Sequence, residues 1–227
     1  MLAYNYGYHT ICNMKPVIVL GAGGVGHEIR EFIENDKGTL GGNYYFHGYL
    51  DDNLEISRLG GVPWLGTIDD YAKFEDSLFI SSIGSAADPR LRSKIKERVV
   101  VPINRWATIV HSAANVSPSA HLYPGTVIYP GCQIGANVEI REHCFLAYNV
   151  TVAHESVINE GTVLASGVNI AGEVTVGAEC YVGPTSSIAH GITVGDSCML
   201  GIGSVVVRDI SKKTRVIQMA REFRLDN

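Results

Sequence analysis

Aliphatic residues recur at every sixth position through the second half of the chain. The series runs from Val110 to Val206 without a slip and fills 17 positions. Four residues after each member stands a small or β-branched residue, and this second column holds four of the five cysteines. Such regular recurrence is typical of repeat architectures, whereas sandwich strands would show a period of two and irregular turn spacing.

The period of six predicts a three-sided coil. Each hexad supplies one short strand and one corner, so three hexads close a turn of 18 residues. The aliphatic column points inward, the small column fills the space near each corner, and successive coils stack as parallel strands about 4.8 Å apart. Gly135 and Gly177 directly follow an aliphatic residue, where a side chain would crowd the corner. We therefore expect a left-handed parallel β-helix of hexapeptide repeats, in which the cysteines are small buried side chains.

The first half of the chain follows a different pattern, in which short apolar strands alternate with amphipathic helices. Strands are expected near 17–20, 45–50 and 78–83, with one helix after the first strand and another from residue 88. Thr67 is placed to cap a further short helix. This alternation is typical of a small parallel α/β domain, and three strands amount to about half of a Rossmann fold.

The two patterns divide the chain into four parts. These are a leader extension (1–13), the α/β domain (14–108), the β-helix (109–210) and a basic C-terminal tail (211–227). The leader lacks the basic and apolar regions of a signal peptide. Arg141 is the only Lys or Arg between Val110 and Val207, and basic residues gather after that stretch. Their cluster fits either a solvated tail or an anion-binding lip beside the last coil.

Composition and charge exclude several classes of protein. Hydrophobic residues make up 46% of the 227 residues, which excludes intrinsic disorder. The net charge of −5 argues against a nucleic-acid partner, and the lack of an apolar run of about 18 residues argues against a membrane span. The cysteines form no CxxC or CxxH pair, so neither a disulfide framework nor a metal site is expected. A reducing cytoplasm is the simplest expected location.

A glycine-rich turn follows the first expected strand. Gly21, Gly23 and Gly26 form a Gly-X-Gly-X-X-Gly motif that opens the first helix. Glycines let the backbone approach a pyrophosphate, and the helix N-terminus offers N–H groups to it. Asp51 follows the second strand, where an acid is placed to bond a ribose or a base edge. NAD is the usual ligand of the motif, but half a dinucleotide fold suits a nucleotide-linked sugar better; a turn without a ligand is the remaining alternative.

One corner of the expected coil gathers groups for acid–base chemistry. Residues 18 apart stack on one edge, which places His154, Gly172 and His190 in successive coils. An imidazole takes a proton near neutral pH, and the N–H of a stacked glycine stabilises a developing oxyanion. Glu155 is placed to hold the other imidazole nitrogen and to raise its basicity. The alternative for either histidine is an ordinary surface residue at a corner.

Four segments together resemble a known family. They are Gly-Ala-Gly-Gly-Val-Gly at 21–26, Tyr-Leu-Asp-Asp at 49–52, Thr-Ile-Val-His-Ser-Ala-Ala at 108–114 and Val-Ala-His-Glu-Ser-Val-Ile at 152–158. With these, the chain resembles the NeuD-type sugar acyltransferases over nearly its whole length. That family includes bacterial sialic acid O-acetyltransferases and N-acetyltransferases that act on nucleotide-linked 4-amino sugars.

The resemblance implies a homotrimer that binds acetyl-CoA between neighbouring β-helices and a nucleotide sugar or sugar acceptor in the α/β domain. It implies that His154 is the general base, that Glu155 tunes it, and that the backbone of Gly172 stabilises the oxyanion. The implied acetyl-CoA contacts are Val163, Gly172, Pro184 and Ile202. The implied acceptor contacts are Gly23, Gly24, Val25, Asp51, Asp52 and Gly84.

The chain departs from the family pattern at three places. Val25 stands where the family often has a histidine in the glycine loop. Val163 stands where some members have a histidine on the acetyl-CoA side, and residues 216–221 replace the usual Gly-x-Pro-Ala ending. The changes bear on the acceptor loop, on one hydrogen bond to the acetyl donor, and on how the tail meets CoA.

The expected function is therefore N-acetylation of a nucleotide-linked amino sugar by direct attack of the amine on the acetyl-CoA thioester. O-acetylation of sialic acid or a related sugar is the enzymatic alternative, because the sequence does not separate amine from hydroxyl acceptors. A non-catalytic, nucleotide-binding trimeric scaffold is the alternative from another class, and the changes at Val25 and Val163 motivate it.

Overall fold

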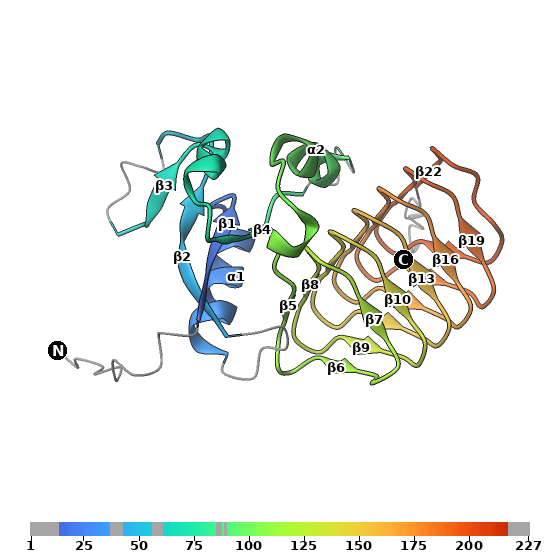
Figure 1. The fold of residues 1–227 in the computed structure, drawn as a ribbon. Helices are drawn as coiled ribbons and strands as arrows, with labels where there is room; N and C mark the ends of the chain where they lie inside the picture. Colours follow the sequence, from blue (N-terminus) through green and yellow to red (C-terminus); the bar gives the residue numbers. More distant parts are fainter. Residues whose placement is uncertain (1–13, 37–42, 56–60, 85–87, 89, 218–227) are drawn as a thin grey trace, which may run out of the picture.

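A computed structural model describes residues 14–36, 43–55, 61–84, 88 and 90–217. Figure 1 shows an α/β domain beside a coiled prism of short strands. The expected leader (1–13) and the end of the chain after residue 217 lie outside the described residues. No helix in the described ranges is long and apolar enough to cross a lipid bilayer.

The α/β domain is built on a four-stranded parallel sheet with the order β3-β2-β1-β4. Its elements are β1 (Lys15–Leu20), α1 (Gly24–Asn35), β2 (Tyr44–Leu50), β3 (Trp64–Gly66), the 3₁₀ helix η3 (Ile68–Lys73), β4 (Leu78–Ser81), α2 (Leu91–Arg98) and the 3₁₀ helix η4 (Ile103–Arg105). The three expected strands and both helices are confirmed. The fourth strand, β3, was not expected from the sequence, because three residues are too short to show a period.

The helices of this domain form where the sequence places their signals. Helix α1 buries Ile29, Phe32 and Ile33 along one side, and these residues join the core of the sheet. The expected short helix is η3, and the N–H and hydroxyl of Thr67 both donate to the carboxylate of Asp70, at 2.8 and 3.1 Å. This contact satisfies groups at the helix start that would otherwise lack a partner.

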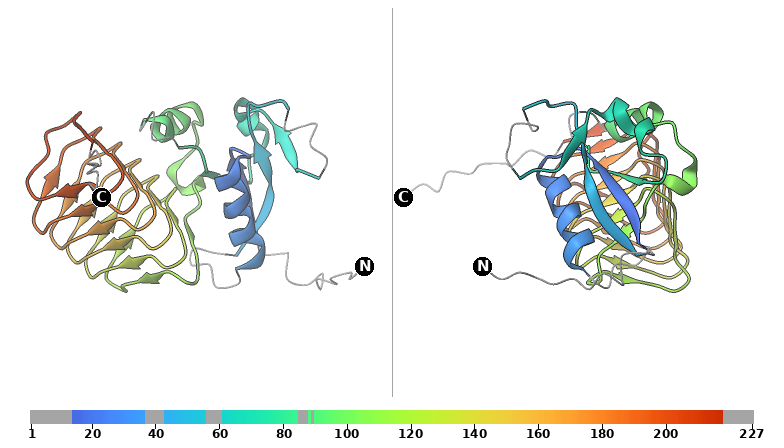
Figure 2. Two further views of the ribbon diagram at one scale, coloured as in Figure 1. Left: turned by 180° about the vertical axis from the view of Figure 1, so that it is seen from behind. Right: turned by 60° about the vertical axis from the view of Figure 1, so that its left-hand side comes forward.

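The second part is a left-handed parallel β-helix with three faces (Figures 1 and 2). The face against which the α/β domain packs, here called the docking face, consists of β5 (Ile109–Val110), β8 (Val127–Ile128), β11 (Phe145–Leu146), β14 (Val163–Leu164), β17 (Tyr181–Val182), β20 (Met199–Leu200) and β22 (Arg215–Val216). The second face consists of β6 (Asn115–Val116), β9 (Gln133–Ile134), β12 (Thr151–Val152), β15 (Asn169–Ile170), β18 (Ser187–Ile188) and β21 (Val205–Val206). The third face consists of β7 (His121–Leu122), β10 (Glu139–Ile140), β13 (Val157–Ile158), β16 (Thr175–Val176) and β19 (Thr193–Val194).

The register of the coils is the one that the six-residue period predicts. Each strand pairs in parallel with the strand 18 residues later, as Thr151 does with Asn169. All 17 aliphatic positions belong to the core of the prism or pack against it. The four cysteines of the described chain are buried, and burial raises the pKa of Cys144 to about 12. At neutral pH that side chain is therefore an uncharged thiol that acts as a small apolar filler.

The outward side chains differ from face to face. The docking face carries an apolar column of six residues, Ile109, Val127, Phe145, Val163, Tyr181 and Met199. The second and third faces present mostly polar residues at the same positions, such as Gln133, Asn169 and Thr175. The α/β domain covers the first two members of the apolar column completely, while the last three are only half-buried.

Side chains from both helices fasten the α/β domain to the prism. On the α1 side, the hydroxyls of Tyr129 and Tyr148 donate to the two carboxylate oxygens of Glu28, at 2.9 and 3.1 Å. On the α2 side, Arg90 pairs with Glu179 at 3.1 Å. The two helices therefore hold the domain along two edges of the docking face.

Candidate active site

The corner between the second and third faces lies opposite the docking face and carries the residues expected to act in acid–base chemistry. His154, Gly172 and His190 occupy this corner in successive coils, as the pairing of β12, β15 and β18 requires. Glu155 follows His154, and Glu173 follows Gly172. These five residues are called the His154 ridge below.

The imidazole of His154 lies against the backbone of Gly172. A β-carbon at Gly172 would come within 2.7 Å of both Cε1 and Nε2 of His154, so any side chain there would displace the ring. Ala171 and Glu173 donate their N–H groups to carbonyls of the neighbouring coils. Within the described coils this ladder does not include the N–H of Gly172, which is therefore positioned to receive a charge that develops beside the ring.

A carboxylate holds the other side of the same ring. Oε2 of Glu155 lies 3.5 Å from Nδ1 of His154. Glu155 has a φ of 58°, a left-handed conformation that is uncommon for residues other than glycine. With Nδ1 facing the carboxylate, Nε2 is the nitrogen that remains to take a proton from a substrate.

A second histidine–carboxylate pair follows in the next coils of the ridge. Nε2 of His190 lies 3.6 Å from Oε1 of Glu173, and the ring centroids of His154 and His190 are 6.4 Å apart. Glu173 also has a φ of 58°. The sequence analysis did not single out Glu173, although its distance of 18 residues from Glu155 is the same stacking rule that joined His154 to Gly172.

Three groups on the ridge come close enough to share a cation. The ligand atoms of His154, Glu155 and Glu173 all lie within 4.8 Å of one another. All three side chains are exposed, and exposed acidic groups of this kind do not by themselves make a metal site. We draw no metal chemistry from them.

The glycine loop keeps the first turn of α1 accessible. Gly21 has a φ of 98°, and a β-carbon at Gly26 would lie 2.2 Å from the carbonyl oxygen of Gly21, so both positions need glycine. Beta-carbons at Gly23 and Gly24 would meet nothing within 4 Å. Gly23 is the N-cap and provides no side-chain cap. The N–H groups at the start of α1 therefore face open space, which suits an anionic ligand.

The two expected acidic residues of the acceptor site have protein partners. The carboxylate of Asp51 accepts hydrogen bonds from the N–H groups of Ala22, at 2.7 Å, and Asn53, at 2.8 Å. Asp52 pairs with Arg98 at 2.5 Å, and this hydrogen bond lowers the pKa of Asp52 below its usual value. Asp51 thus fixes the glycine loop to the end of β2, and Val25 lies exposed on that loop.

One expected acceptor residue meets one expected acetyl-CoA residue on the docking face. A β-carbon at Gly84 would lie 4.0 Å from Cγ2 of Val163. Gly84 is exposed and Val163 is half-buried. The space in front of the glycine loop therefore continues onto the apolar column of the docking face.

The remaining expected acetyl-CoA contacts lie on another edge. Pro184 and Ile202 occupy the corner between the docking face and the second face, where the N–H of Gly203 donates to the carbonyl of Pro184 at 2.8 Å. Ile202 is 68% exposed. Within one chain, the expected residues thus form two groups: the acceptor loop and CoA residues on or beside the docking face, and the His154 ridge on the opposite side of the prism.

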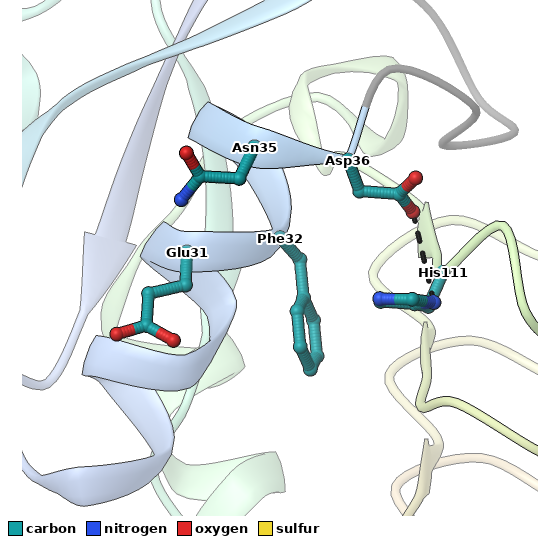
Figure 3. Close-up of a pocket in the computed structure, with 5 residues that line it drawn as sticks. All are labelled: Glu31, Phe32, Asn35, Asp36 and His111. Atoms are coloured by element: carbon teal, nitrogen blue, oxygen red, sulfur yellow. Dashed lines mark ion pairs between the residues drawn. The ribbon is translucent and has the colours of Figure 1, made fainter.

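A separate hollow of about 350 Å³ lies between the end of α1 and the first coil (Figure 3). Glu31, Phe32, Asn35, Asp36 and His111 line it. Nδ1 of His111 lies 3.8 Å from a carboxylate oxygen of Asp36. The hollow is at the opposite end of α1 from the glycine loop, so it does not belong to the candidate site.

Comparison with known proteins places the α/β domain first. Residues 16–99 match the PglD N-terminal domain. That span runs from β1 through α2 and includes the glycine loop, Asp51 and Gly84. Among curated protein sequences, none matches the chain.

Several solved structures share both parts of the fold. The acetyltransferase domain of PglB from Neisseria gonorrhoeae FA1090 is 25% identical, with a TM-score of 0.73 over 86% of this chain and 93% of that chain. PerB from Caulobacter crescentus, solved in complex with CoA and GDP-perosamine, is 24% identical, with a TM-score of 0.73 over 88% of this chain and 92% of that chain. WeeI from Acinetobacter baumannii AYE is 20% identical, with a TM-score of 0.72 over 90% and 97%. The PglD-type α/β domain and the hexapeptide-repeat β-helix thus occur together in these proteins, which confirms the fold and the resemblance expected from the sequence.

Proposed function

We propose that this protein is an acetyl-CoA-dependent N-acetyltransferase that acts on a nucleotide-linked amino sugar, with His154 as its general base. The observation that carries the proposal is the contact between His154 and the bare backbone of Gly172, with Glu155 3.5 Å from the other ring nitrogen. The similar fold of PglB, also solved in complex with acetyl coenzyme A, and of PerB in complex with CoA and GDP-perosamine supports this chemistry and substrate class.

The reaction needs only groups of the His154 ridge. The acceptor nitrogen attacks the carbonyl carbon of the thioester, and the N–H of Gly172 stabilises the charge that forms on the oxygen. Nε2 of His154 takes a proton from the nitrogen. When the C–S bond breaks, the CoA thiolate leaves and receives that proton. Attack is direct, because the cysteines of the described chain are buried in the core.

The acceptor side of the proposal rests on the glycine loop. The open start of α1 suits the diphosphate of a nucleotide sugar, and Gly23 and Gly24 leave room for its close approach. Asp51 holds that loop in place through the N–H of Ala22. We infer that Val25, Asp52 and Gly84 border the bound acceptor, since they lie on the same edge of the sheet.

Acetyl-CoA is a substrate, and the residues around the prism suit its parts. Val163 and Ile202 offer apolar surface for the pantetheine arm, beside Pro184. Lys212, Lys213 and Arg215, which are all exposed on the last coil, suit its phosphates. Gly172 completes this set at the thioester.

The placement of the two groups of residues supports a homotrimer. The α/β domain of one chain sits on the docking face, whereas its own His154 lies on the opposite ridge. An acceptor held by that domain therefore meets an imidazole only if a second chain supplies it. The half-buried residues Val163, Tyr181 and Met199 continue the apolar column beyond the α/β domain, and closed symmetric rings are the usual way to cover such a surface.

The test is acetyl transfer measured as thiol release from acetyl-CoA. The acceptors are GDP-perosamine, UDP- and dTDP-linked 4-amino sugars, and sialic acid as the hydroxyl acceptor. We expect release with an amino-sugar nucleotide and a loss of about 100-fold or more in His154→Ala, because a general base contributes about 10²–10⁴. Activity within about threefold of wild type in His154→Ala would contradict the general-base role.

The same panel separates the other two functions. Release with sialic acid alone would establish the O-acetyltransferase. Binding of a nucleotide sugar, seen as a rise in Tm, without release from any acceptor would favour the non-catalytic scaffold.

A further inference from the structure

The His154 ridge holds more proton-accepting groups than one acyl transfer from a neutral nucleophile requires. His154 with Glu155 makes one pair, and His190 with Glu173 makes a second at 3.6 Å. The two rings lie 6.4 Å apart between centroids. Carboxylate oxygens of Glu155 and Glu173 both lie within 4.8 Å of a ring nitrogen of His154, so the second pair faces the reacting centre.

The electrostatic setting of the ridge favours a cation. Glu155 and Glu173 sit in register on successive coils, and like charges opposite each other on neighbouring strands are destabilising. Arg141 is the only Lys or Arg between Val110 and Val207, and it pairs with Glu139 on the third face. A positive group that enters between the two carboxylates relieves their repulsion.

Proton counting shows why an amine acceptor needs the second pair. An amine that binds as an ammonium has three protons and no free electron pair, and the product amide keeps one proton. One proton must leave before the N–C bond forms, and another leaves the nitrogen after it has formed. A hydroxyl acceptor loses only one proton in the same transfer.

We propose that Glu173 binds the acceptor ammonium and that Glu173 and His190 accept its first proton, which leaves His154 free for the second. This inference rests on the proposed function and adds two residues to it. The first proton passes from the nitrogen to Glu173 and through His190 to solvent. The second passes to His154 and then to the CoA thiolate when the C–S bond breaks, so charge and protons balance.

The other titratable groups near His190 are few. His154, Glu155 and Glu173 face it from the preceding coils. In the next coil, Arg208 is exposed, and the carboxylate of Asp209 accepts the N–H of Thr193 at 2.8 Å. The pH dependence tested below therefore belongs to the histidine–carboxylate pairs of the ridge and to the acceptor amine.

The test compares kcat/KM against pH for wild type, Glu173→Asn and His190→Gln, with the amino-sugar nucleotide that the panel identifies. Asparagine suits the left-handed backbone at this position, since Asn137 adopts a φ of 57° one corner stack below Glu155. Both replaced side chains are more than half exposed, so Tm should not change. His121→Gln, which removes an exposed histidine of the third face, is the matched control.

We expect both ridge variants to lose about tenfold or more in kcat/KM below the pKa of the acceptor amine. Above that pKa the amine binds without its extra proton, and the loss should shrink to about threefold or less. The KM for acetyl-CoA and the whole profile of His121→Gln should match wild type.

A loss that is equal at every pH, or no loss at all, would overturn the inference while wild-type activity leaves the proposed function standing. A wild type that transfers no acetyl group to any acceptor would instead overturn the proposed function itself.

Discussion

The imidazole of His143 is buried between the ring of Trp106, 4.6 Å away between centroids, and the backbone of Gly125. Its Nε2 has no hydrogen-bond partner within the described residues. Burial, with the nearby charges of Arg92 and Lys96, lowers the pKa of His143 to about 3. In the unfolded chain the same group titrates near its ordinary value of 6.5.

This difference makes stability depend on pH. Below about 6.5 the unfolded chain binds a proton that the folded chain does not, so the free energy of unfolding falls by up to about 1.4 kcal/mol per pH unit. We expect His143→Asn to flatten the fall between about pH 6.5 and 5, as measured by urea unfolding. Asparagine tolerates the φ of 59° at this position. Equal slopes for variant and wild type in this window would contradict the prediction.

At the scale of single residues, the sequence predicted the site where stacking alone decides it. His154 and Gly172 are 18 residues apart, and that distance fixes their contact in any such coil. The partners of Asp51 could not be predicted in this way. Its carboxylate turns back to the N–H of Ala22, which depends on how two loops meet at the edge of a sheet rather than on a period.

At the scale of elements, α2 joins the two parts through one buried guanidinium. Nε of Arg92 donates to the carbonyl of His143 at 2.8 Å, and Nη1 donates to the carbonyl of Ile83 at 3.3 Å. The group lies over the ring of Phe145 at 5.5 Å. Burial lowers the pKa of Arg92 to about 10, so the side chain is still a cation at neutral pH. It thereby ties the end of β4, next to Gly84, to the prism.

Replacing this fork should weaken the junction. We expect Arg92→Lys to lower the free energy of unfolding by about 1–3 kcal/mol, because an ammonium cannot reach both carbonyls in the same geometry. Because Gly84 would lose its fixed position, the KM for the acceptor should rise more than the KM for acetyl-CoA. The neighbouring exposed Lys94, changed to Met, is the control and should stay within about 0.5 kcal/mol of wild type. A lysine variant as stable as wild type would show that the fork is dispensable.

The elements themselves followed from the sequence to different degrees. The 17 aliphatic positions specify every coil, because each inward side chain repeats the same packing problem. Strand β3 was missed, since its three residues, Trp64–Gly66, gain their place from pairing with β2 rather than from their own pattern. The role of α2 was equally hidden, because the buried residue that matters, Arg92, is charged and interrupts an apolar helix face.

At the scale of the whole molecule, the α/β domain and the His154 ridge lie on opposite sides of the prism. If neighbouring chains complete the site, two different inactive variants should restore activity when they are mixed. His154→Ala removes the ridge. Gly24→Glu places a carboxylate at the open start of α1, where it suits the helix but repels a diphosphate, and a β-carbon at Gly24 meets nothing within 4 Å.

Refolding the two variants together in equal amounts should give about a quarter of wild-type activity. In a ring in which each domain serves the ridge of the next chain, a site is intact only when an alanine variant precedes a glutamate variant, and random mixing gives this order about one time in four. Mixing folded trimers without refolding is the control and should stay inactive. No recovery after refolding would show that each chain serves its own ridge, which the distance across the prism forbids unless the α/β domain detaches from the docking face.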